Sequence, residues 1–533
     1  MVASLKPDEF EAMATLGDIP RHHGRTRANH VALSFEGRDT TYGEFDRHTA
    51  QVAAALVAAG VKPGECITYL GKNSDHYFEL VLGAARMGAI MAPIGWRLSP
   101  AEVAYIVDDA QAKFMFVGPE CIACAQEAAA QSETAPALVA MEAGEHGLPV
   151  YAAWRDAQQA RDPGLEADPE ATALLLYTSG TTGRPKGVML SSANLLRSRR
   201  TLAEASMGWN EFQEGETNLV AMPMSHIGGT GWGLVGLING VKNIVTREFN
   251  PVEVLEMIER HRIAKMFMVP AALQFVIRMP RAREIDYSSL KHILYGASPM
   301  PVDLLRECME VFGCQFCQQY GMTETTGTIV YLPPQDHDPK GNKRMASAGI
   351  PMPGVEICIL DEKGHRLGPN QTGEIATRSA ANMKGYWRKP DATASTVNAD
   401  GWLRTGDAGY IDEDGYLYIQ DRIKDMIISG GENVYPAEVE NAIHGHPAVA
   451  EVAVIGVPDA TWGEAVKAVV VPKPGAAPEA EDIIAFAKTR IAHFKTPKSV
   501  EFRAEPLPRS ASGKILRREL REPYWAGKER RVN

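Results

Sequence analysis

Helical segments alternate with short apolar segments over the first 330 residues, and this alternation limits the chain to a small set of folds. One unit shows the pattern clearly: Asn250 and Pro251 are typical of a helix start, and a strand-like segment at 266–269 follows the helix. Because two strands joined through a helix pack side by side in the same direction, the alternation predicts a parallel sheet covered by helices. We therefore expect an α/β fold for this part of the chain.

The sequence changes character twice beyond this region. Over about 340–420, short segments separated by turn signals predict a small β-rich, barrel-like subdomain. Farther on, a helix near Pro436, two strands and a helix over 481–492 are typical of a smaller α+β domain. A chain of 533 residues exceeds what one hydrophobic core supports. We therefore expect a large N-terminal domain over 1–422 and a smaller C-terminal domain over 423–533.

Composition and charge exclude several classes of protein. With 45% hydrophobic and 23% charged residues, the chain has the balance of a globular protein, which excludes a disordered or fibrous one. The net charge of −11 argues against nucleic acid as a partner. The N-terminus lacks the layout of a secretory signal, and no apolar stretch reaches the roughly 20 residues that cross a bilayer. We therefore expect a cytoplasmic protein without stable membrane insertion.

A loop rich in glycine and hydroxyl side chains follows the continuous apolar run 173–177, which is typical of a strand buried on both faces. Glycines admit backbone N–H groups to phosphate oxygens, hydroxyls donate further hydrogen bonds, and a lysine neutralises charge. The loop differs from the mononucleotide P-loop because Pro185 precedes its lysine and Gly187 follows it. The residues expected to contact phosphate are Thr178, Ser179, Gly180, Thr181, Thr182, Gly183 and Lys186.

The segment 178–187, Thr-Ser-Gly-Thr-Thr-Gly-Arg-Pro-Lys-Gly, resembles the signature loop of the acyl-adenylate-forming superfamily. This superfamily includes acyl-CoA synthetases, firefly luciferases and peptide-synthetase adenylation domains. Further segments match the family in its order: Tyr-Gly-Met-Thr-Glu at 320–324, Gly-Trp-Leu-Arg-Thr-Gly-Asp at 401–407, Asp-Arg-Ile-Lys-Asp at 421–425 with Ser-Gly-Gly-Glu at 429–432, and Pro-Arg-Ser-Ala-Ser-Gly-Lys at 508–514. The resemblance therefore covers nearly the whole chain. It implies an acid:CoA ligase that forms an acyl-AMP intermediate and uses ATP, Mg²⁺ and coenzyme A.

The resemblance also assigns residues around ATP. It implies that Thr323 contacts the α-phosphate, that Glu324 and Thr178 hold Mg²⁺, and that Tyr320 stacks on adenine. Oxygen ligands of this kind suit Mg²⁺. Asp407 is expected at the ribose, because one carboxylate can accept hydrogen bonds from two adjacent hydroxyls. The other residues expected at the nucleotide are Gly296, Ala297 and Ser298, which form the wall opposite Tyr320, and Gln319, Gly321, Met322, Ile419 and Arg422.

Lys514 is the residue we expect to drive adenylation, together with Lys186. Negative charge gathers on the oxygens in flight when a carboxylate attacks the α-phosphorus, and a positioned ammonium group offsets it. The C-terminal domain of the family swings about a hinge, which aligns here with Lys424. The swing is expected to replace Lys514 with Gly430 and Gly431, which would line the tunnel for the pantetheine arm of CoA.

By resemblance, the tail of the acid runs past 224–232, Gly296 and 322–328, with the catalytic candidate His226 at the mouth of the pocket. Apart from Glu324, these segments carry no charged residue. A second carboxylate or an α-ammonium group on the substrate would therefore be desolvated without a partner. We expect a monocarboxylic acid with an apolar tail, either a fatty chain or an aromatic ring.

Three alternatives remain open. The adenylate could pass to a separate carrier protein, the fold could serve a luciferase-like oxygenase, or the chain could be a non-catalytic regulator. The regulator is disfavoured because the four charged residues of the motifs are all present: Lys186, Glu324, Asp407 and Lys514. Small molecules, namely the acid, ATP and CoA, are the partners we expect, and a homodimer is left open.

Overall fold

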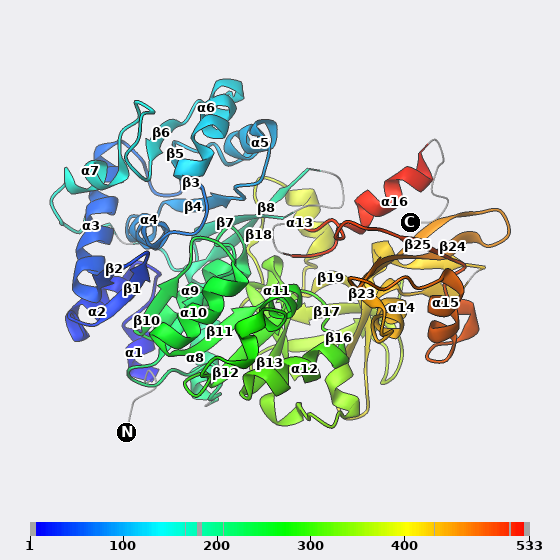
Figure 1. Cartoon of the computed structure of the whole chain (residues 1–533). Coiled ribbons are helices and arrows are strands. Elements are labelled where there is room, and N and C mark those ends of the chain that lie inside the picture. The colour runs from blue at the N-terminus through cyan, green and yellow to red at the C-terminus, as the bar shows by residue number, and fades with distance from the viewer. Residues whose placement is uncertain are drawn as a thin grey trace.

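The computed structural model describes residues 7–165, 167–178, 184–205, 207–430, 432–510 and 513–526, and it omits the side chain of Lys424. It is a mixed α/β structure with four sheets. Figure 1 shows the first residues (blue to cyan) on one side of the molecule and the last residues (orange to red) on the other. None of the described helices has the length and apolar content that a membrane crossing needs.

Two mainly parallel sheets form the larger part of the structure. The nine-stranded sheet contains, in spatial order, β15 (Ile350–Pro351), β14 (Gly327–Leu332), β13 (Gln315–Met322), β12 (His292–Gly296), β11 (Ile263–Met268), β9 (Thr217–Val220), β10 (Lys242–Val245), β1 (Val31–Phe35) and β2 (Arg38–Thr41). The seven-stranded sheet contains β18 (Gly385–Tyr386), β8 (Lys186–Ser191), β7 (Thr172–Thr178), β4 (Ile90–Ile94), β3 (Cys66–Leu70), β5 (Phe114–Val117) and β6 (Ala137–Ala140). The expected parallel pairing holds in the middle of both sheets, whereas β2, β8, β14, β15 and β18 pair antiparallel.

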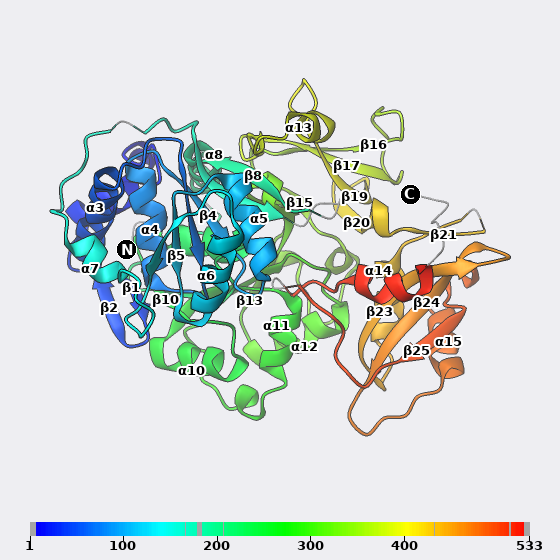
Figure 2. The ribbon, with the colours of Figure 1, turned by 90° about the horizontal axis from the view of Figure 1, so that it is seen from above.

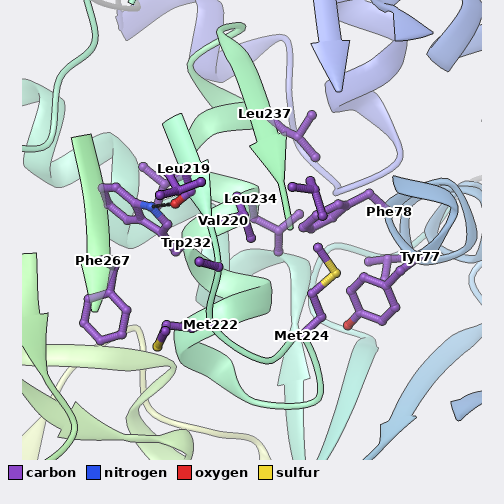
Figure 3. Close-up of a cluster of buried hydrophobic side chains, with 14 of the residues drawn as sticks. Tyr77, Phe78, Leu219, Val220, Met222, Met224, Trp232, Leu234, Leu237 and Phe267 are labelled. Atoms are coloured by element: carbon purple, nitrogen blue, oxygen red, sulfur yellow. Dashed lines mark hydrogen bonds between the residues drawn. The ribbon is translucent and has the colours of Figure 1, made fainter. Parts of the chain in front are cut away.

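Two helices lie between these sheets, α4 (Asp75–Arg86) and α9 (Ile227–Ile238). Figure 3 shows Phe78 and Tyr77 of α4 facing the leucines of α9. A Cβ atom at Gly233 of α9 would overlap the ring of Phe78, so only glycine permits this approach. The other helices are α1 (Pro7–Glu11), α2 (Asp18–Thr26), α3 (Tyr42–Ala58), α5 (Pro100–Ala110), α6 (Ile122–Gln131), α7 (Tyr151–Asp156), α8 (Ser192–Glu204), α10 (Pro251–His261), α11 (Pro270–Ile277), α12 (Val302–Phe312) and α13 (Pro390–Thr396).

Local signals in the sequence explain several of these elements. Asn250 caps α10 by accepting hydrogen bonds from the backbone N–H groups of Val252 and Glu253, as its position before Pro251 predicts. The apolar run 173–177 lies within β7, and its three leucines are almost fully buried. β7 is therefore an interior strand of its sheet, between β4 and β8.

A four-stranded antiparallel sheet follows, made of β16 (Glu356–Leu360), β17 (Gly373–Arg378), β19 (Leu403–Ile411) and β20 (Leu417–Arg422). The last sheet contains β22 (Glu432–Val434), β21 (Ile427–Ser429), β24 (Gly463–Pro472), β23 (Val449–Asp459) and β25 (Ser499–Phe502), with helices α14 (Pro436–His444), α15 (Ala480–Lys488) and α16 (Arg517–Trp525). Figure 2 shows these two sheets beside each other. The helix expected over 481–492 ends four residues early, at Lys488, and a separate tight turn follows at His493–Lys495.

One ion pair and one hydrogen bond, both to Asp421, tie β20 to the helices of the last sheet. Arg517 of α16 lies 3.5 Å from the carboxylate of Asp421 on β20 and 2.6 Å from that of Glu440 on α14. A weaker contact of 3.9 Å joins Arg517 to Asp425. The backbone N–H of Ala437 donates to the other oxygen of Asp421 at 2.8 Å. Asp421 is therefore the point at which the end of the antiparallel sheet meets the C-terminal residues.

Candidate active site

Thr178 and Glu324 meet where β7 and β13 end. The hydroxyl of Thr178 lies 3.5 Å from Oε1 of Glu324, which follows β13 in a tight turn and is 6% exposed. Lys186 faces Thr178 across the β7–β8 pair. These three predicted residues therefore share one region. The other loop residues, Ser179, Gly180, Thr181, Thr182 and Gly183, lie outside the described residues.

Tyr386 completes this group, and the sequence patterns did not indicate it. Its hydroxyl donates to Oε1 of Glu324 at 2.9 Å, and the ammonium of Lys186 lies 5.0 Å from the centre of its ring. Burial and the neighbouring carboxylate raise the pKa of Tyr386, so the hydroxyl keeps its proton and donates. Tyr386 reaches the site only because β18 pairs with β8, and a tyrosine in a turn-rich segment gives no local sign of such pairing.

The oxygens of Glu324 and Thr178 fit a magnesium ion. Among the described residues, no group of three or more metal-binding side chains surrounds a point that could hold a metal ion by itself. Mg²⁺ commonly binds one or two protein carboxylates and completes its coordination with substrate phosphates and water. One buried carboxylate beside a hydroxyl, at the end of a loop rich in phosphate-binding groups, is a donor set of this kind.

Asp407 lies at the centre of a second buried group. Its Oδ2 accepts a hydrogen bond from the hydroxyl of Tyr320 at 2.7 Å, and its Oδ1 lies 2.8 Å from Nε of Arg422. Asp407 raises the pKa of Arg422, and burial together with this carboxylate raises the pKa of Tyr320. Each carboxylate oxygen has two lone pairs, so both can still accept from a sugar hydroxyl. Tyr320, Asp407 and Arg422 are thus brought together as the resemblance implied.

The segment opposite Tyr320 is held by close backbone contacts. A Cβ atom at Gly296 would overlap the carbonyl oxygen of Gln319 on the paired strand, and one at Gly321 would overlap that of Gly327. Ala297 has a φ of 67°, a left-handed conformation that is strained for a residue with a side chain. Both glycines are therefore required by the sheet itself. The remaining predicted residues of this region follow in sequence: Ser298 after Ala297, Met322 at the end of β13, and Thr323 at the start of the turn that holds Glu324.

His226 immediately precedes α9 and responds to a charge from the C-terminal residues. Burial, and then the positive charge of Lys514, lower its pKa to about 4. Its Nε2 is buried and has no hydrogen-bond partner among the residues that the structure describes. A buried polar atom of this kind ordinarily has a partner, so it is suited to a bound ligand. His226 is therefore neutral near pH 7.

Arg509 anchors the loop that carries Lys514. It pairs with Glu451 of β23 at 2.7 Å and donates to the carbonyl oxygen of Gly513 at 2.9 Å. A Cβ atom at Gly513 would lie 3.2 Å from the side chain of Val269, which precedes α11. The loop therefore lies directly on the N-terminal residues beside His226.

Four predicted residues have no described contact with this region: Gly430, Ile419, Gly431 and Lys424. Gly430 follows β21 with a φ of 61°, and its N–H donates to the carbonyl oxygen of Trp462 at 2.8 Å. Ile419 lies on β20 opposite Gly409. Gly431 and the side chain of Lys424 lie outside the described part of the chain. Within the described part of the chain Gly430 contacts Trp462 and not Glu324 or His226, whereas the charge of Lys514 acts on His226.

Comparisons with known proteins cover nearly the whole chain. The family model described as AMP-binding enzyme matches residues 20–387, and that of the AMP-binding enzyme C-terminal domain matches residues 438–514. A fatty acid–[acyl-carrier-protein] ligase, ScoC of Streptomyces coeruleorubidus, is 40% identical over 98% of both chains. A feruloyl-CoA synthase of an Amycolatopsis species is 38% identical over 96% of this chain and 99% of its own.

A solved structure extends the comparison to three dimensions. The anthranilate CoA ligase AuaEII, in complex with anthranoyl-AMP, superposes with a TM-score of 0.88 at 26% identity, covering 98% of this chain and 99% of its own. The large N-terminal and smaller C-terminal parts of the fold are thus confirmed. The chain therefore belongs to the AMP-binding enzyme family and, within the acyl-adenylate-forming superfamily, to the branch of the CoA ligases.

Proposed function

We propose that the protein activates a carboxylic acid with ATP to an acyl-adenylate and then transfers the acyl group to coenzyme A. The observation that carries this proposal is the position of Lys514. Its charge acts on the buried His226, and its loop lies against Val269. Both interactions join the C-terminal residues to the large N-terminal part of the fold. Because Lys514 brings a positive charge to the neutral, buried His226, it can stabilise an anion that binds beside the histidine.

In the first step, a carboxylate oxygen attacks the α-phosphorus, and the bond from that phosphorus to the pyrophosphate oxygen breaks. Lys514 offsets the charge that gathers on these oxygens, and Lys186 offsets that of the departing phosphates. Glu324 and Thr178 would hold Mg²⁺, which supplies further positive charge to the phosphates. Tyr386 orients Glu324 through its hydrogen bond. His226, being neutral, adds no positive charge that would compete with Lys514 for the carboxylate.

In the second step, the sulfur of a thiol attacks the acyl carbon, and AMP leaves. Several features of the C-terminal residues support CoA as the source of this thiol. Trp462 and Phe494 are large aromatic side chains left 47% and 42% exposed, and the ammonium of Lys498 lies 5.6 Å from the ring of Trp462. Exposed rings can stack on the adenine of CoA, and neighbouring ammonium groups can pair with the phosphates of CoA. Because Gly430 lacks a side chain, the backbone passes directly over the indole of Trp462.

The acid in this proposal has a mainly apolar body. Apart from Glu324, the segments 224–232 and 322–328 contain no charged residue that could pair with a charged group on the body of the acid. Relatives in the family are named for fatty acids, for ferulate and for indoleacetate, so both a fatty chain and an aromatic ring agree with the comparisons. The experiment below distinguishes a fatty chain from an aromatic ring.

A carrier protein is the second candidate for the acceptor. The observation that favours it is the 40% identity to an acyl-carrier-protein ligase over nearly the full length of both chains. The first half-reaction is the same in both cases, so only the acceptor distinguishes them.

The proposal is tested by measuring pyrophosphate release over a panel of fatty and aryl acids, with no acceptor, with CoA or with a pantetheinylated carrier protein. Thioester formed with CoA supports the proposal, and thioester formed only on the carrier protein supports the second candidate. A product that requires oxygen instead would indicate a luciferase-like oxygenase. If no acid releases pyrophosphate, the activation itself is excluded.

A further inference from the structure

One face of β13 and β14 is directed away from the nucleotide residues. Neighbouring residues of a strand point to opposite faces, so the side chain of Gln319, which the resemblance assigned to the nucleotide, lies on the face opposite Tyr320, whose hydroxyl reaches Asp407. The hydroxyl of Thr328 donates to Oε1 of Gln319 at 3.1 Å, and Tyr331 pairs with Gln319 across the two strands. Thr328 and Tyr331 therefore share the face of Gln319.

The segment after α8 covers this face. The ring of Trp209, which is 5% exposed, lies 5.4 Å from that of Tyr331. Lys265 of β11 holds this segment in place. Its buried ammonium donates to the carbonyl oxygen of Gly208 at 2.9 Å and to that of Glu211. Asn210 is consequently held in place between Trp209 and α8, with its side chain 6% exposed.

A small pocket lies between α8, the start of β14 and the segment after β15. Its lining includes Arg199 and Leu202 of α8, Thr326 and Thr328, and Met352. The pocket adjoins the reaction region, because Thr326 follows Glu324 by two residues. A Cβ atom at Gly327, between the two threonines, would lie 3.8 Å from the side chain of Ile227, the neighbour of His226.

Arg199 differs from the other arginines of α8. Arg197 pairs with Glu170 at 2.5 Å, and Arg200 pairs with Glu204 at 2.9 Å. Nη1 of Arg199 donates to Oδ1 of Asn210 at 3.0 Å, and no described carboxylate lies within ion-pair distance of this guanidinium. Burial, with no neighbouring charge, lowers the pKa of Arg199 to about 10. A guanidinium has five N–H donors, so most donors of Arg199 remain for another acceptor.

Resting on the proposed function, we propose that Arg199 binds an oxygen atom at the far end of the acid's tail. The substrate class is then an acid with an apolar body that ends in a hydroxyl, keto, ether or carboxylate oxygen. Arg199 lies on α8, outside the segments whose lack of charge led us to expect a wholly apolar tail. It provides the partner that those segments do not offer, and Thr326 and Thr328 add small polar side chains to the same pocket.

The test compares matched acids in the pyrophosphate-release reaction. One pair is cinnamate and para-hydroxycinnamate, and the others are fatty acids of increasing length with their ω-hydroxy and α,ω-dicarboxylic counterparts. For at least one pair, the wild-type enzyme is expected to favour the oxygen-ended acid by at least about tenfold in kcat/KM, the scale of a hydrogen bond to a charged group. The hydroxy and dicarboxylic arms show whether a neutral or an anionic oxygen is preferred.

The decisive variant is Arg199→Met, with Arg200→Met as the matched control on the same helix. Arg199→Met should lower kcat/KM for the favoured oxygen-ended acid by about tenfold and leave its apolar counterpart within about twofold. Arg200→Met should leave the ratio of the two acids unchanged. Activity toward the apolar acid shows that the variant is folded. Should Arg199→Met not fold, Arg199→Lys replaces it and should reduce the ratio by losing the forked donor geometry.

Two results overturn the inference while leaving the proposed function intact. The first is a wild-type enzyme that activates acids but never favours the oxygen-ended member of a pair. The second is a variant at Arg199 that changes both members of a pair equally. Absence of pyrophosphate release with every acid would instead exclude the proposed function.

Discussion

The pKa values of His226 and Tyr386 are both shifted by burial and by a neighbouring charge, in the direction that favours the neutral side chain. The histidine lies near an ammonium group and is held neutral, while the tyrosine lies beside a carboxylate and is held protonated. Both states serve the proposed reaction, since one avoids a competing cation and the other maintains a donor to Glu324. One prediction concerns how His226 affects the pH dependence of stability, and another concerns how the hydroxyl of Tyr386 affects adenylation.

Replacing His226 should change how stability depends on pH. Its folded pKa of about 4 lies below the ordinary value of 6.5, so the neutral form contributes stability that is fully present above pH 6.5. This contribution is lost as the pH falls from 6.5 through 4. We expect urea unfolding of the wild type to lose up to about 3 kcal/mol more than His226→Gln over this range, at 1.36 kcal/mol per pKa unit. Parallel pH profiles of the two proteins would contradict the assignment.

Removing the hydroxyl of Tyr386 should impair adenylation. Tyr386→Phe deletes the hydrogen bond to Glu324, and a bond to a charged group is worth about 1.5–3 kcal/mol. We expect pyrophosphate release to fall by about tenfold or more and the Mg²⁺ concentration for half-maximal rate to rise. Tyr418→Phe is the control, because the carboxylate next to its hydroxyl is Asp412 and not Glu324. An unchanged Mg²⁺ dependence in Tyr386→Phe would mean that the tyrosine does not orient the carboxylate.

At the scale of elements, the two large sheets are joined through α4 and α9. These helices approach so closely that Gly233 lies directly on the ring of Phe78. The position of α9 matters for the site because His226 immediately precedes its first residue. Packing between these helices therefore sets the position of the histidine.

Gly233→Ala should destabilise the protein. The added methyl group would overlap the Phe78 ring, and overpacking of a dense core costs about 1–3 kcal/mol. Gly208→Ala is the matched control, since a Cβ atom there would meet no atom within 4 Å. The measurement is the free energy of unfolding in urea. Equal stability of the two variants would show that α4 and α9 can separate without cost.

Elements that depend on neighbours in sequence were predictable, whereas contacts between distant segments were not. Asn250 caps its helix and the run 173–177 forms a buried strand, because both signals are local. Tyr386 reaches Glu324 through the pairing of β18 with β8, and Arg199 contacts Asn210 through the packing of α8. No local pattern encodes either contact. Motifs that resemble a family carried such long-range information for Tyr320, Asp407 and Arg422, and for them the expected cluster is present.

At the scale of the whole molecule, the proposal assigns the two half-reactions to two different loops of the C-terminal residues. The loop of Lys514 lies at His226, while Gly430 lies against Trp462. The expected boundary at 422/423 falls between β20 and β21, and movement about Lys424 stays a prediction. A pair of variants separates the two loops.

Lys514→Ala should lower acyl-adenylate formation by about 10²–10³, the effect of losing one preorganised charge. Transfer from preformed acyl-AMP to CoA should persist. Gly430→Val should show the reverse, because its φ of 61° and the contact with Trp462 leave no room for a side chain. Gly463→Ala is the control for the second variant, since it shares a positive φ but would contact no neighbour. Equal loss of both half-reactions in either folded variant would contradict the division.

Adjacent residues of β20 serve both ends of the molecule. Arg422 pairs with Asp407 at the nucleotide residues, and Asp421 pairs with Arg517 of the C-terminal helix. A rearrangement of the C-terminal residues that breaks the second pair acts on the residue next to the first. Coupling between two equilibria is reciprocal. If ATP or AMP changes the equilibrium between two orientations of the C-terminal domain by some factor, the change of orientation alters the affinity for that nucleotide by the same factor. If the C-terminal domain moves as predicted, release of AMP and the return of the domain would be two measurements of one coupling free energy.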